Sequence, residues 1–94
     1  MRLTKTDGLY LSIARFAEDT GITFRQAVEL RALCMRAFRA GEYACNTDSK
    51  AAREREILAG EKVKQYAEPL GLAVSWPGLW PCFSKDGRDY DLPG

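Results

Sequence analysis

The feature that most constrains the fold is a helical period that runs for about six turns and ends at Cys45. It starts at Thr23 with the segment TFRQ, a capping-box pattern in which two side chains satisfy free backbone amides. Along one side of this predicted helix, mostly small residues recur every three or four positions, as in seams where helices pack closely. These residues, called the small seam below, are Ala27, Leu30, Cys34, Ala37, Gly41 and Ala44. The sequence therefore predicts a helix over residues 23–45 with one face suited to another helix.

A second helical period covers residues 50–68 and follows a break of only a few polar residues, in which Asp48 or Ser49 can cap the new helix. A connection this short favours two antiparallel helices. The sequence therefore predicts an antiparallel helical hairpin. The seam expected on its second helix, which Glu56 interrupts, consists of Ala52, Ala59, Val63, Tyr66 and Leu70.

The two ends of the chain complete the predicted architecture. Residues 8–20 read as a shorter helix, with Asp7 as its N-cap and Gly21 as its stop. Residues 72–92 have the alternation and turn signals of a small β-hairpin or meander. With 94 residues the chain has room for one core, so we expect a single domain of the α+β class that is mainly helical.

Two turn signals divide the predicted meander. Trp76 to Leu79 has Pro and Gly at its two central positions, which predicts a type II turn. Asp86 and Gly87 predict a second, tight turn. Because Pro81 lacks a backbone N–H, we expect its strand at an edge of the sheet.

Composition narrows the classes of function. The formal net charge is +1, so overall charge gives no argument for nucleic acid as a partner. Because the chain has no histidine, histidine-dependent nucleophilic triads and mixed zinc sites are excluded. Three cysteines without a C-x-x-C pair indicate reduced thiols. We therefore expect a protein that is not an enzyme, with no metal and no cofactor.

Hydropathy bears on location. No run of about 18 apolar residues occurs, and the first residues lack the apolar block of a signal peptide. We expect a cytoplasmic protein without a membrane partner.

Charged residues gather on the two predicted long helices. Arg25, Glu29, Arg36 and Arg39 form a mainly basic stripe on the first, and glutamates at 54, 61 and 68 form an acidic stripe on the second. Such stripes are most simply solvated faces supported by pairs within one helix. The alternative is that Arg25, Arg36 and Arg39 contact a nucleic-acid backbone or an acidic partner, while the acidic stripe meets a basic protein surface.

Bulky apolar residues on the same first long helix need a cover. They are Phe24, Val28, Met35 and Phe38, with Arg31 between them, and they are called the bulky stripe below. The first helix and the tryptophan segment are the candidates to cover it.

The C-terminal segment is the strongest candidate for a partner-binding surface, because Trp, Tyr and Arg most often dominate the energy of interfaces. The four candidates are Trp76, Trp80, Arg88 and Tyr90. The alternative is that one or both tryptophans belong to the core. We expect one tryptophan to be mostly buried against the bulky stripe and the other, Trp80, to be available to a partner.

Residues 7–28, DGLYLSIARFAEDTGITFRQAV, resemble the helix, Thr-Gly turn and second helix of ribbon-helix-helix regulators. That resemblance implies a dimer with a short strand over residues 2–6, in which Arg2, Thr4 and Lys5 would read DNA bases.

Residues 30–83 are similar to small uncharacterised proteins encoded by phages and prophages. The resemblance is carried by the helix end EYACN, an Arg/Glu-rich helix that ends in Leu-Gly, and a short hairpin. It implies stoichiometric binding to a host protein or complex, including inhibition of a host defence system. The sequence thus predicts a noncatalytic binding protein, with a dimeric DNA-binding regulator as the alternative. It leaves open whether the protein is a monomer or a homodimer.

Overall fold

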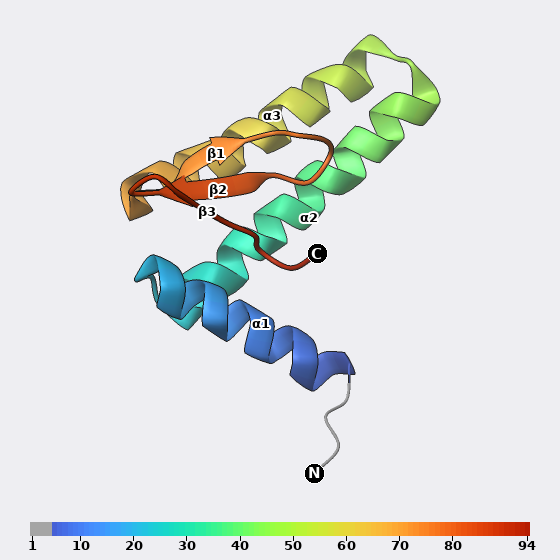
Figure 1. Cartoon of the computed structure of the whole chain (residues 1–94). Coiled ribbons are helices and arrows are strands. Elements are labelled where there is room, and N and C mark those ends of the chain that lie inside the picture. Colours follow the sequence, from blue (N-terminus) through green and yellow to red (C-terminus); the bar gives the residue numbers. More distant parts are fainter. Residues whose placement is uncertain (1–4) are drawn as a thin grey trace.

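The structure, a computed structural model, describes residues 5–94 and the side chains from residue 8 onward. Three helices are followed by a small sheet, so the predicted α+β, mainly helical class is confirmed (Figure 1). None of the described helices is both long and apolar enough to cross a bilayer. In chain order the elements are α1 (Lys5–Thr20), α2 (Phe24–Thr47), α3 (Lys50–Ala67), a 3₁₀ turn (Glu68–Leu70), β1 (Ala73–Ser75), β2 (Cys82–Lys85) and β3 (Arg88–Tyr90).

Helices α2 and α3 lie side by side as an antiparallel hairpin (Figure 1). The predicted capping box is present: Gln26 N donates to Thr23 Oγ1 at 3.0 Å, and Thr23 N donates to Gln26 Oε1 at 2.9 Å. α2 runs two residues beyond the predicted end at 45. Asp48 then adopts a left-handed backbone with φ 48°, and Ser49 caps α3.

The small seam is the buried face of α2, since its six residues are the six buried residues of that helix. Facing it, α3 buries Ala52, Val63 and Ala67, while Ala59 and Tyr66 are half-buried. The prediction missed Ala67, which lies one turn after Val63 and accepts a hydrogen bond from Leu72 N at 3.2 Å. Small side chains on both helices allow the close approach that the seam pattern predicted.

Helix α1 begins earlier than the sequence suggested. Because it starts at Lys5, Asp7 belongs to its first turns and is not an N-cap. The strand expected over residues 2–6 does not include Lys5 and Thr6. Their backbone follows the helical hydrogen-bond pattern as part of α1. The other two predicted base-reading residues, Arg2 and Thr4, lie outside the described residues. α1 ends as predicted at Gly21, which has φ 74°.

The sheet is antiparallel in the order β1-β2-β3, with Val74 opposite Phe83 and Phe83 opposite Tyr90. The second predicted turn is confirmed: Asp86 and Gly87 alone join β2 to β3, and both have positive φ (52° and 78°), as tight hairpin turns require.

The first predicted turn is wrong. Ser75 pairs with Cys82, so a six-residue loop, called the 76–81 loop below, joins β1 to β2. A type II turn needs positive φ at its third residue, and Gly78 does not have it. Pro81 is not at a sheet edge either. It is buried and directly precedes β2, the central strand, where its missing N–H removes no ladder hydrogen bond because pairing begins at Cys82.

The core lies where α1, the hairpin and the sheet meet. Phe83, on the inner face of the central strand, is completely buried and meets Phe16 of α1 edge to face, with ring centroids 5.7 Å apart. Leu30 of α2 and Val63 of α3 are fully buried in the same cluster. Phe83 therefore ties the sheet to the helices.

Replacing Phe83 by alanine is expected to lower the free energy of unfolding by about 3–5 kcal/mol, since it leaves a large cavity in a closed core. Urea denaturation followed by circular dichroism measures this change. Leu11→Ala is the matched control, because Leu11 lies exposed on α1. Equal effects of the two substitutions would contradict the place of Phe83 at the centre of the core.

Candidate functional site

A hollow of the described surface lies between the helical hairpin and the 76–81 loop, and it is called the Trp76 groove below. It has a volume of about 340 Å³. α2 and α3 form one side, and the loop forms the other. The lining residues are Ala37, Gly41, Glu56, Ile57, Gly60, Glu61, Lys64, Trp76, Gly78 and Leu79.

Two glycines, one in α2 and one in α3, allow the 76–81 loop to pack against the helices. A Cβ atom on Gly41 would lie 2.8 Å from Leu79 Cδ2, and one on Gly60 would lie 3.6 Å from Trp76 Cζ2. Glycine within a helix costs about 0.5–1 kcal/mol relative to alanine. Because Gly41 has no side chain, Leu79 can lie directly on the backbone of α2. Glycines inside two predicted helices were a signal of this loop contact, but no pattern in the sequence named Trp76 or Leu79 as their neighbours.

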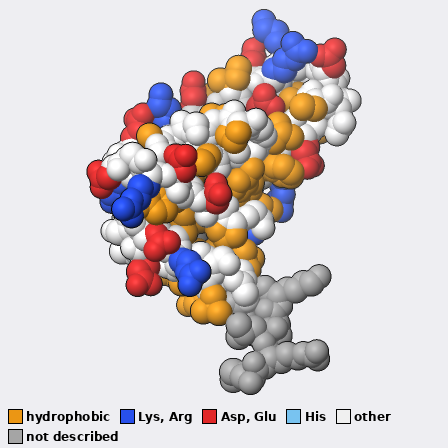
Figure 2. Space-filling model, viewed as in Figure 1, with side chains coloured by type: hydrophobic (Ala, Val, Ile, Leu, Met, Phe, Trp, Pro, Cys, Tyr) orange, Lys and Arg blue, Asp and Glu red, His pale blue; other side chains and the backbone are white. Residues whose placement is uncertain are grey.

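Large apolar side chains at this groove remain open to solvent. Trp76 is 42% exposed and Ile57 is 59% exposed. Figure 2 shows hydrophobic side chains gathered over the middle of this face, beside the loop that joins β1 and β2. Burying such side chains against a partner removes apolar surface from water, which is the main favourable term in protein association.

The rim of the Trp76 groove carries an excess of negative charge. Glu56 is half-buried, and its Oε2 would lie 3.1 Å from a Cβ atom on Gly41. Among the described residues neither Glu56 nor Glu61 forms an ion pair. Lys64 is the one cation of the lining, and its Nζ lies 3.7 Å from Glu68 Oε1, outside the groove lining.

Trp80 is half-buried and packed against α2, so the expectation that it is the available tryptophan is wrong. Its Nε1 donates to Leu92 O at 2.8 Å, and its ring meets Phe38 of the bulky stripe edge to face, with centroids 6.2 Å apart. The physical reason is that both the ring and the N–H of Trp80 find partners inside the chain, next to Pro81, which is buried. One tryptophan does cover the bulky stripe, but it is Trp80, and Trp76 is the exposed one.

The other two predicted partner-binding residues lie elsewhere. Arg88 is exposed in β3, opposite Lys85. Tyr90 is half-buried and lines a separate hollow of about 330 Å³ beside α1, together with Arg15. The structure therefore does not gather the four candidates into one surface, and only Trp76 lies in the Trp76 groove.

The rest of the bulky stripe is covered only in part, since Val28 stays 40% exposed. Tyr10 of α1 lies against Phe24, with ring centroids 4.4 Å apart. Arg31 donates from Nε to Pro93 O at 3.0 Å, so it holds the C-terminal segment. Both covers expected for the stripe, α1 and the C-terminal segment, are therefore used.

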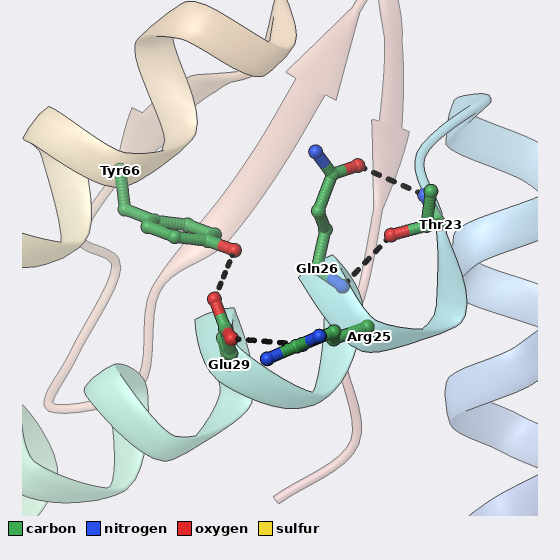
Figure 3. A network of polar contacts seen from close by, with 5 residues as sticks. All are labelled: Thr23, Arg25, Gln26, Glu29 and Tyr66. Carbon is green, nitrogen blue, oxygen red and sulfur yellow. Dashed lines mark hydrogen bonds and ion pairs between the residues drawn. The ribbon is translucent and has the colours of Figure 1, made fainter.

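A polar network joins the basic stripe to α3 (Figure 3). Arg25 Nε lies 3.5 Å from Glu29 Oε1, and Glu29 Oε2 accepts a hydrogen bond from Tyr66 at 2.7 Å. Arg25 thus has a carboxylate partner on its own helix. Arg36 and Arg39 are exposed, and neither forms an ion pair within the described part of the chain.

The cysteines differ in burial, and all three are free. Burial raises the pKa of Cys34 to about 12, although the charge of Arg31 acts in the opposite direction. That thiol therefore stays protonated at neutral pH and behaves as a small apolar side chain. Among the side chains that the structure describes, from residue 8 onward, no group of three Cys, Asp or Glu is placed to hold a metal ion.

Comparison of the chain with protein-family models, with curated proteins and with solved structures found no match. The resemblances to phage proteins and to ribbon-helix-helix regulators therefore stay predictions.

The Tyr66 phenol is expected to make stability depend on pH in alkali. Burial raises the pKa of Tyr66 to about 12 from a usual value of 10.0, and the hydrogen bond to Glu29 and its charge add to the increase. As pH rises from about 10 to about 12, the unfolded chain loses this proton first, so the folded state binds more protons and stability falls.

Urea denaturation across this pH window measures the effect, and Tyr66→Phe should reduce the alkaline fall in stability. Glu29→Gln should lower the pKa of Tyr66, seen as phenolate absorbance that appears at lower pH. An alkaline fall of the same size in wild type and Tyr66→Phe would show that the pair does not act in this way.

Proposed function

We propose that this protein is a noncatalytic binding protein that holds a segment of a partner protein in the Trp76 groove. The observation that carries the proposal is the position of Trp76. Its ring rests on the helix backbone at Gly60 and stays 42% exposed in a hollow lined mostly by apolar residues.

Trp76 and Trp80 differ in whether their ring and N–H are free to contact a partner. Trp80 already has its N–H bonded and its ring packed against Phe38. The Trp76 indole has no hydrogen bond to any described residue. Tryptophan is among the residues that most often contribute the largest share of binding energy when a partner covers them. Trp76 is therefore the side chain that supports binding at this surface.

The charge of the rim favours a particular occupant. Glu56 and Glu61 line the groove, and neither forms an ion pair with another described residue. The charge of Lys64 lies near Glu68, which is outside the lining. A lysine or arginine of the partner would be attracted by both carboxylates, and it could also lie over the face of Trp76. The proposed occupant is a protein segment that presents a lysine or arginine next to an apolar side chain.

The lining of the Trp76 groove includes no serine, threonine, cysteine, tyrosine or histidine. Its charged groups are Glu56, Glu61 and Lys64, and we assign them to charge recognition of the partner. The similarity to small phage proteins leads us to expect a host protein as the partner, with a host defence protein as one candidate. The DNA-binding alternative has less support, because Lys5 lies in α1 and not in a strand.

Trp76→Ala is expected to weaken binding of the partner by about 30-fold or more, which corresponds to the roughly 2 kcal/mol lost at a typical hot spot. The intact chain is immobilised, proteins of a bacterial lysate are captured and quantified by mass spectrometry, and the affinity of each candidate is then measured by calorimetry. The partner should be retained by wild type and lost by Trp76→Ala.

Tyr43→Ala is the matched control, since Tyr43 is an exposed aromatic residue of α2 outside the groove lining. This control should bind the partner like wild type. Thermal denaturation of both variants separates a binding defect from loss of the fold. Unchanged affinity in Trp76→Ala, or equal loss in both variants, would refute a role of the Trp76 groove.

A further inference from the structure

A second groove lies on the outer side of the hairpin, and it is called the outer groove below. It has a volume of about 200 Å³, and its lining residues, among those that the structure describes, all belong to α2 and α3. Along α3 its residues Leu58 and Lys62 lie two positions before Gly60 and Lys64 of the Trp76 groove. Two residues correspond to about 200° around a helix, so the two grooves open on opposite sides of α3. The lining residues of the outer groove are Leu33, Arg36, Arg55, Leu58, Ala59 and Lys62.

The outer groove brings together three cations from two helices. Arg36 comes from α2, and Arg55 and Lys62 come from α3. No acidic residue lies three or four positions from any of them, the spacing at which a helix forms ion pairs. None of the three forms an ion pair with another described residue. Their charges are therefore available to a ligand.

The carboxylates that lie one helical turn before a leucine of the lining do not cancel this charge. Glu29, one turn before Leu33, already accepts from Tyr66 and lies beside Arg25. Glu54, one turn before Leu58, is exposed and is not among the lining residues. Counting Glu54 against the three cations still leaves a positive excess. An anionic ligand is therefore favoured by charge.

The floor of the outer groove adds a second requirement. Leu58 is 57% exposed, and Leu33 and Ala59 are half-buried. A nucleic-acid backbone would pair with the cations but leave this apolar floor uncovered, and the lining has no aromatic side chain on which a base could stack. A protein segment with both carboxylates and an apolar side chain meets both requirements.

We propose that the outer groove binds an acidic amphipathic segment of a protein, whose carboxylates pair with Arg36, Arg55 and Lys62 and whose apolar side chain lies on Leu58. This site is separate from the Trp76 groove in place and opposite in charge. The protein would then present two docking surfaces, one for a basic segment and one for an acidic segment, on opposite sides of one helical hairpin.

The test uses the full chain and a display library of random short peptides. Selected peptides are synthesised, and their affinities are measured for two triple variants. The first removes the charges of the outer groove: Arg36→Gln, Arg55→Gln and Lys62→Gln. The second, Arg15→Gln, Lys50→Gln and Arg88→Gln, removes three exposed cations outside it and changes the net charge equally.

We expect selection of a class of acidic peptides that also carry an apolar residue. The first triple variant should bind them about 10-fold or more weakly, because several charge pairs are lost together, while the second triple variant and Trp76→Ala should bind like wild type. Circular dichroism checks that both triple variants remain folded. If the first triple variant does not fold, Leu58→Ser replaces it and is expected to weaken binding of the same peptides.

Three outcomes would overturn the proposal. Acidic peptides that bind both triple variants equally would show attraction by net charge alone. Binding of a random DNA duplex that the first triple variant loses, without a selected acidic peptide class, would assign the outer groove to nucleic acid. Self-association in sedimentation equilibrium that only the first triple variant abolishes would make it a contact between copies of this chain.

Discussion

Close contact between α2 and α3 is the constraint on which the rest of the structure depends. The small seam is fully buried, and only Leu30 in it has a large side chain. Because the facing residues of α3 include Ala52 and Ala67, the two helices approach closely over their length. This approach places side chains of both helices next to one another on each side of the hairpin. The Trp76 groove and the outer groove are therefore both products of one helix contact.

The two sides of the hairpin then acquire different characters. On the side that the 76–81 loop covers, Gly41 and Gly60 let Leu79 and Trp76 lie on the helices, and glutamates form the rim. On the other side the described lining residues all come from α2 and α3, and arginine and lysine side chains surround exposed Leu58. The net charge of +1 does not reveal that acidic and basic residues lie on opposite sides of the hairpin. Opposite charges cancel in the sum, but each groove still has its own local charge.

Features with a local cause could be predicted from the sequence. The capping box at Thr23 and the tight turn at Asp86 depend on residues within a few positions of one another. The 76–81 loop could not be predicted in this way. Its Pro-Gly pair is compatible with a type II turn, but contacts with distant helices outweighed that local preference. Tertiary contacts also reversed the expected roles of Trp76 and Trp80, since the ring of Trp80 packs on Phe38 and its N–H bonds to Leu92 O.

The sequence by itself determined the class of fold, the helical hairpin and the face by which its helices meet, because a period of three to four residues already states which side of a helix is buried. Only the tertiary structure decided which tryptophan stays exposed and which charges share a groove. Arg36 and Lys62 are 26 positions apart, and Gly60 and Trp76 are 16 apart. No periodic pattern relates such positions. They become neighbours only when the chain packs, and the packing of the whole core selects them.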